Sequence, residues 1–196
     1  PERWPLGEPD LIVKMDRAYS IPADGPDIYR NFVIDTGLTE ETWIRAIDVK
    51  PSTPQVDNHV IVFGDGMGMA EAMDKRDEEP GFAEMIPPSN MLGGYVPGAD
   101  PIKLPDDLSL RLAGNMPLVL QTHFHPTGKP ETEQLEVCLY FADKPSAKSI
   151  VGMQMPQMFG IGAGSDIPAG EDNYLLEHKV VLPVDAEAIV VGGHAH

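Results

Sequence analysis

The chain has a single cysteine, Cys138, among its 196 residues. One cysteine excludes an internal disulfide and excludes the cysteine-rich zinc sites that need several thiolates. Cys138 lies in an apolar run typical of a strand, so we expect it to be a core residue rather than a nucleophile. The sequence also lacks any apolar run long enough to span a membrane, so no membrane span is predicted in this segment.

Basic residues are scarce as well. Lysine and arginine total 14 against 31 aspartates and glutamates, which gives a formal net charge of -17. A surface this acidic repels phosphate backbones and anionic lipids, so nucleic-acid and membrane-surface partners are not expected. It attracts metal ions or a basic partner instead. Nucleophile elbows, phosphate-binding loops and CxxC motifs are also missing from the sequence.

The chain does contain short segments rich in β-branched and aromatic residues, and 20 prolines and 19 glycines separate these segments. Strands at this spacing, separated by turn residues, are typical of an antiparallel sandwich. We therefore predict an all-β fold, a jelly-roll-like antiparallel β-sandwich, with one short helix near residues 71–77. The predicted strands are 11–15, 28–34, 42–49, 59–63, 117–124, 135–142, 174–182 and 188–191.

An irregular segment at 152–170 indicates a boundary between two parts of the chain. We predict a first sandwich over residues 1–150 and the start of a second, similar sandwich over residues 151–196. Because the sequence stops at His196, directly after a predicted strand, we expect it to be a fragment of a longer protein.

Four of the six histidines form two His-x-His pairs, His123/His125 and His194/His196. On a strand, residues i and i+2 point to the same face, so each pair can present two imidazoles to one ion. Neutral imidazole is a good ligand for copper or zinc. The alternative is that these are surface histidines at strand ends, and the spacing alone favours neither interpretation.

The other two histidines stand alone. His59 opens an apolar run and by alternation shares a face with Ile61 and Phe63, so it is either a ligand or a buried, hydrogen-bonded core histidine. His178 lies within a predicted strand between charged residues, and we expect a structural or solvent-facing role for it.

Five segments occur in an order that carries a family resemblance. They are 56–63 (VDNHVIVF), 94–98 (GYVPG), 120–129 (LQTHFHPTGK), 167–170 (IPAG) and 194–196 (HAH). In this order the chain resembles the copper type II, ascorbate-dependent monooxygenases, the family of peptidylglycine hydroxylating monooxygenase and dopamine hydroxylase. It is most similar to bacterial members that are fused to redox or cytochrome domains. The collinear set extends over nearly the whole chain.

The resemblance implies two β-sandwiches that each hold one copper. The first copper has three histidine ligands and relays an electron; here His59 and His123 match two of them. Asn58 stands where the family has the first member of an adjacent histidine pair. Because His125 should face the same way as His123, we hypothesise that His59, His123 and His125 form this metal site, with Asn58 as an outer neighbour or a vestige.

The second copper of the family has two histidines and a methionine and activates oxygen. His194 and His196 match the two histidines and are the predicted catalytic ligands. The matching methionine would lie downstream of His196.

The function expected from this resemblance is a secreted, periplasmic or extracellular copper-dependent monooxygenase. It would hydroxylate an unactivated C–H bond of a small-molecule or peptide substrate, using O2 and an external one-electron reductant, with a redox or cytochrome partner domain. The alternative is a non-catalytic copper-binding, electron-transfer or scaffold module of a larger redox assembly that has lost the complete first copper site. A plain β-sandwich adhesion or ligand-binding domain is the third interpretation.

Overall fold

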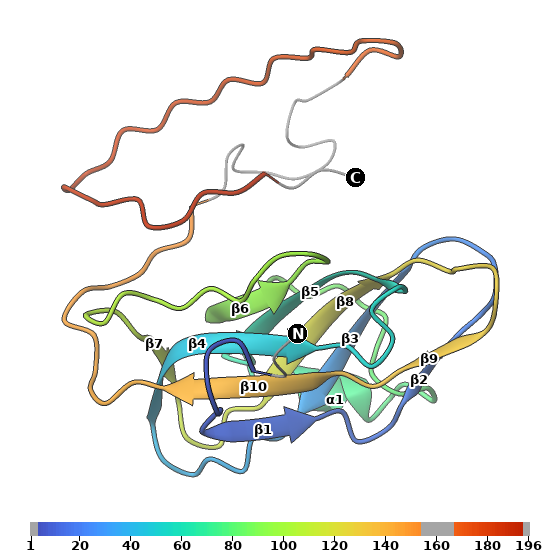
Figure 1. Cartoon of the computed structure of the whole chain (residues 1–196), viewed down its shortest axis with the longest axis horizontal. Helices are drawn as coiled ribbons and strands as arrows, with labels where there is room; N and C mark the ends of the chain where they lie inside the picture. The colour runs from blue at the N-terminus through green and yellow to red at the C-terminus, as the bar shows by residue number, and fades with distance from the viewer. Residues whose placement is uncertain (1–3, 154–166, 194–196) are drawn as a thin grey trace. The chain divides into compact units, whose positions relative to one another are not determined.

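The computed structural model describes residues 4–153 and 167–193. The chain divides into two compact units, Pro1–Ile150 and Val151–His196. Nearly all regular structure in the described residues is β-strand, and every strand pair is antiparallel, which confirms the predicted all-β sandwich (Figure 1). No helix of the described part is long and apolar enough to cross a membrane.

Two four-stranded sheets and a two-stranded ribbon build the first unit. The first sheet has the order β1 (Leu11–Lys14), β10 (Glu136–Phe141), β4 (Thr42–Lys50) and β7 (Leu110–Leu112). The second sheet has the order β3 (Ile28–Ile34), β8 (Leu118–Phe124), β5 (Asp57–Gly64) and β6 (Met91–Tyr95). The ribbon pairs β2 (Tyr19–Ile21) with β9 (Glu131–Glu133), and one helix, α1 (Ala70–Asp74), follows β5.

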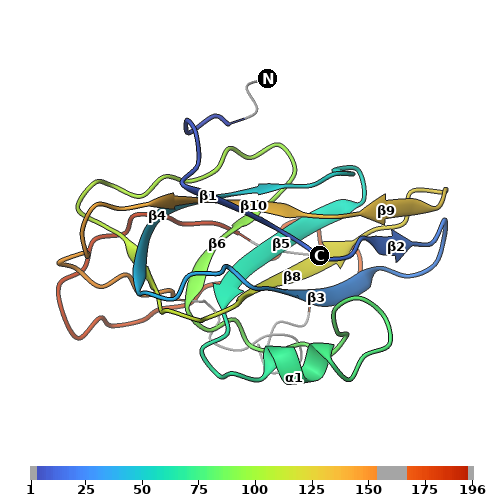
Figure 2. The ribbon, with the colours of Figure 1, turned by 90° about the horizontal axis from the view of Figure 1, so that it is seen from below.

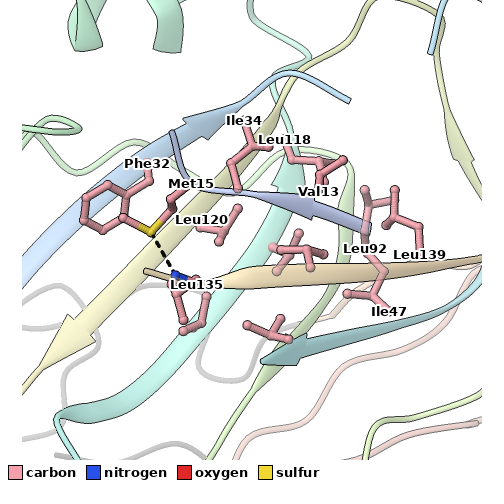
Figure 3. Packing of buried hydrophobic residues seen from close by; sticks show 14 of the residues in the cluster. Val13, Met15, Phe32, Ile34, Ile47, Leu92, Leu118, Leu120, Leu135 and Leu139 are labelled. Atoms are coloured by element: carbon pink, nitrogen blue, oxygen red, sulfur yellow. Dashed lines mark hydrogen bonds between the residues drawn. The ribbon is translucent and has the colours of Figure 1, made fainter. Parts of the chain in front are cut away.

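The main core lies between the two sheets. Side chains alternate along each strand, so every second residue points at the facing sheet and is removed from water. Near β1 and β10, the backbone N–H of Leu135 donates to the sulfur of Met15 at 3.3 Å, a contact drawn in Figure 3. The labelled core residues of that view are Val13, Met15, Phe32, Ile34, Ile47, Leu92, Leu118, Leu120, Leu135 and Leu139, all buried.

The outer face of the second sheet carries a smaller apolar cluster. It consists of Phe63, Ala70, Phe82 and Val119. Asn31 and Phe82 exchange two backbone hydrogen bonds of 2.9 Å, which fix the segment around Phe82 to β3, and α1 also contacts β3 (Figure 2). These elements cover one part of the outer face. The histidines lie on the same face, toward the end of β8.

Six of the predicted strands are confirmed as β1, β3, β4, β5, β8 and β10, and the predicted short helix is confirmed as α1. The burial of Cys138 is confirmed as well. Four short strands, β2, β6, β7 and β9, were not predicted. They are three to five residues long. Tertiary partners, rather than local sequence preference, hold such short segments extended.

The predicted strands at 174–182 and 188–191 are wrong, because the described residues 167–193 contain no strand. Their apolar side chains are largely exposed, and Val181 and Val191 are 83% and 95% accessible. A strand is stable only when neighbouring strands take up its backbone hydrogen bonds and cover one of its faces. No described residue of this segment has such a strand partner.

Candidate functional site

A β-bulge at Asn58 places His59 beside His123. The pairing of β5 with β8 is irregular between Asp57 and His59, so Asn58 is an extra residue in the ladder. Without it, residues 57 and 59 would point to the same face of the sheet. The bulge reverses the alternation. Asp57 pairs with the core residue Phe124, whereas His59 pairs with His123 on the outer face.

The two imidazoles of this pair are close enough to share one metal ion. Their ring centroids lie 5.1 Å apart, with the rings 80° from coplanar. Two imidazoles that bind one ion at about 2.0–2.1 Å, the length of a zinc–imidazole bond, place their centroids roughly 4.5–6.5 Å apart. The ring of His123 is fully buried, and His59 is half-buried at the edge of the cluster. The spacing therefore fits a shared ion that is reached from the His59 side.

Tyr29 extends the pair into a row of three rings across neighbouring strands. It lies opposite His123 on β3, and the two rings stack with centroids 4.2 Å apart and planes 19° from parallel. Tyr29 is 41% exposed. Its ring therefore covers one face of His123 and separates that imidazole from solvent.

Asp27 connects His123 to His125. This aspartate is in the turn just before β3, and its two carboxylate oxygens bond different histidines. Oδ2 lies 2.7 Å from Nε2 of His123, and Oδ1 lies 2.6 Å from Nδ1 of His125. The backbone N–H of His125 donates to the carbonyl of Val56 at 2.8 Å, so His125 continues the extended path of β8. The hydrogen bonds from His125 and His123 lower the pKa of Asp27, which favours an ionised carboxylate.

Asn58 is a neighbour of His59 rather than an opposing ligand. Its Oδ1 lies 3.2 Å from Nδ1 of His59. With Nδ1–H donating to this oxygen, the imidazole carries its lone pair on Nε2. Histidines that bind metals almost always donate their other ring N–H to an oxygen in this way.

A pair of buried carboxyl groups lies behind the bulge, on the core side. Glu133 is fully buried and accepts three hydrogen bonds, from the Ser52 N–H at 2.7 Å, the Ser52 hydroxyl at 2.9 Å and the Thr53 N–H at 2.7 Å. Among the described residues, no donor reaches either oxygen of Asp57. Burial, and then repulsion from the Glu133 carboxylate, raise the pKa of Asp57 to about 8. Asp57 is therefore mainly protonated at neutral pH and can donate to Glu133.

Comparison with protein-family models, with curated proteins and with solved structures gives no match to this chain.

The structure brings only part of the predicted site together. Throughout residues 4–153 and 167–193, no group of three or more His, Cys, Asp or Glu side chains is placed to hold a metal ion. His59 and His123 are adjacent, and His125 joins them through Asp27, so the three-histidine site stays a prediction. His194 and His196 lie outside the described residues. His178 is exposed, as expected.

Two residues of the cluster carried no signal in the sequence. Asp27 reads as an ordinary turn acid after Gly25 and Pro26, and Tyr29 reads as an ordinary strand aromatic. Their link to His123 depends on the pairing of β3 with β8, which joins segments far apart in the chain.

Proposed function

We propose that this chain is a copper-binding β-sandwich of the ascorbate-dependent monooxygenase kind, in which His59 and His123 hold one copper ion. The observation that carries the proposal is the register of these two residues on β5 and β8, with ring centroids 5.1 Å apart. Imidazole nitrogen is a preferred ligand of copper in both common oxidation states. The net charge of -17 supports the proposal further, because it concentrates cations at the surface.

Copper at this position would supply a one-electron redox couple. The residues around it have separate tasks. Asn58 and Asp27 orient the imidazoles through the hydrogen bonds at their other ring nitrogens, and Tyr29 keeps water from one face of His123. His125 is the candidate third ligand, held near the pair by Asp27.

Two roles for such a copper are consistent with this cluster. In a monooxygenase His59 and His123 would hold an electron-relaying copper, and His194 and His196 would hold the copper that supplies the oxygen chemistry for C–H hydroxylation. In a non-catalytic module the site would only bind copper or pass electrons within a larger redox assembly. The second role is favoured by Asn58, which occupies the position of an expected ligand.

Copper stoichiometry tests the binding proposal. Metal-free protein is titrated with Cu(II) and followed by electron paramagnetic resonance, first as wild type and then as the double variant His194→Ala/His196→Ala. We expect the double variant to bind one equivalent and to lose it when His59→Ala is added. The exposed His178→Ala is the matched control and should keep every equivalent. A double variant that binds no copper at low micromolar concentration would contradict the proposal.

Turnover separates the two roles. A monooxygenase consumes O2 in the presence of ascorbate in proportion to a hydroxylated product, and His194→Ala/His196→Ala should abolish that product. A copper-binding module takes up one copper, is reduced by ascorbate and forms no hydroxylated product.

A further inference from the structure

The carboxylate of Asp27 bonds two of the three candidate ligands, and it does so through different ring atoms. It reaches Nε2 of His123 with one oxygen at 2.7 Å and Nδ1 of His125 with the other at 2.6 Å. Both distances are those of strong, charge-assisted hydrogen bonds. Two histidines at the end of β8 thus bond the same carboxylate through different ring nitrogens.

A carboxylate that only accepts hydrogen bonds fixes the tautomer of each neutral imidazole. A neutral imidazole has one N–H, and that proton must lie on the nitrogen that faces the carboxylate. In its neutral form, His123 would therefore carry its proton on Nε2 and its lone pair on Nδ1. Neutral His125 would carry its proton on Nδ1 and its lone pair on Nε2.

Only the lone-pair nitrogen of a neutral imidazole can bind a metal ion. We infer that Asp27 is the positioning residue of this site: it selects opposite tautomers of His123 and His125 and so decides which nitrogen of each ring is offered to a metal. The inference rests on the proposed copper site for its function. Asp27 selects the tautomers in the metal-free protein, before any ion is bound.

The surroundings of Asp27 support a positioning role. Ile28 begins β3 directly after it, and β3 pairs with β8 along the whole of both strands, from Ile28 opposite Phe124 to Ile34 opposite Leu118. The backbone that carries Asp27 is therefore fixed relative to His123. The N–H of His125 is held by the carbonyl of Val56, so all three side chains extend from anchored backbone.

Nitrogen-15 NMR of metal-free protein reads the tautomers directly. Long-range nitrogen–proton correlations at pH 8, where unperturbed imidazoles are neutral, distinguish a protonated Nδ1 from a protonated Nε2 in each ring. His123→Asn and His125→Asn assign the two sets of signals. In the wild type we expect His123 as the Nε2–H form and His125 as the Nδ1–H form, each as the dominant species.

Three substitutions of Asp27 test whether its carboxylate selects the tautomers. Asp27→Ala should return both rings to mixtures of the two forms. Asp27→Asn should disturb at least one ring, because an amide offers one acceptor oxygen and one donor group instead of two acceptor oxygens. Asp27→Glu, which keeps both oxygens, should restore part of the selection. The exposed Asp24→Asn in the same turn is the control and should leave both rings unchanged.

Copper affinity provides the second readout. Loss of a carboxylate that orients a ligand typically lowers metal affinity about 10–100-fold, and we expect a loss of this order for Asp27→Ala, with partial recovery in Asp27→Glu. A wild-type His123 protonated on Nδ1, or an Asp27→Ala spectrum identical to that of the wild type, would overturn the inference. Failure of the wild type to bind copper would overturn the proposed function alone, because the tautomers are measured without metal.

Discussion

Replacement of Asp57 by asparagine should make the protein more stable at neutral pH. In the folded protein, burial and the neighbouring Glu133 carboxylate raise the pKa of Asp57 from 3.8 to about 8. The unfolded chain loses this proton near pH 4, whereas the folded chain keeps it until about pH 8. The stability that depends on this proton is therefore complete below pH 4 and is lost progressively as the pH rises toward 8.

The size of the loss follows from the shift. One pKa unit corresponds to about 1.4 kcal/mol, so Asp57 lowers the free energy of unfolding by about 4 kcal/mol between pH 4 and pH 7. Asparagine has no proton to lose, and one of its N–H groups can donate to Glu133. Its second N–H would be buried without an acceptor, which costs about 1–3 kcal/mol. We expect Asp57→Asn to raise the free energy of unfolding by about 1–3 kcal/mol at pH 7, relative to the wild type. At pH 4.5 we expect the free energy of unfolding to stay the same or to fall.

Urea denaturation at pH 4.5, 5.5, 6.5 and 7.5 measures this effect. The informative quantity is the difference in unfolding free energy between variant and wild type, because the titrations of groups that do not interact with Asp57 cancel in it. Asp100→Asn, at an exposed aspartate, is the control for the same change of side chain at the surface. If the Asp57→Asn difference did not change with pH, Asp57 would not be protonated in the folded protein and the reasoning would be refuted.

The remaining predictions concern packing, and each is read as a change in the urea midpoint. Gly94→Ala would place a Cβ against the carbonyl oxygen of Val60 and should cost about 1–3 kcal/mol, whereas Gly152→Ala, in open space, should cost almost nothing. Leu118→Ala should cost about 2–5 kcal/mol, since this side chain is fully buried in the main core; a cost under 1 kcal/mol would contradict that packing. Arg30→Met removes the bonds from a buried guanidinium to the carbonyls of residues 80 and 81 and to a nearby carboxylate, and should cost about 2–3 kcal/mol.

The strands that could be predicted from the sequence are those whose residue types themselves favour an extended, buried backbone. Both β3 and β8 consist mostly of β-branched, aromatic and aliphatic residues, and their bounds match the prediction closely. The opposite case is β6, whose sequence MLGGY reads as a turn. Gly94 is needed because β6 approaches β5 so closely that a Cβ at this position would overlap the backbone of Val60. That requirement appears only once β5 and β6 are paired.

Part of the candidate site could also be predicted from the sequence. His59 and His123 were predicted as ligands, and they are neighbours across the strand pair. Asp27 was not predicted, because it is 96 residues away from His123 in the chain and meets it only through the pairing of β3 with β8. The bulge at Asn58 was not predicted either. It depends on how two distant strands align, which local residue preference does not encode.

The position of the histidines within the second sheet decides how the cluster can move. His59 and His123 lie on β5 and β8, the two inner strands, and each of these strands is hydrogen-bonded to a neighbour on both sides. His123 pairs with Tyr29 on one side and with His59 on the other, so local fraying exposes its imidazole only when both ladders open. Amide hydrogen exchange at His123 should therefore approach the rate of global unfolding. An ion held by the pair would then leave through side-chain rotation at the half-buried His59 rather than through opening of the sheet around His123.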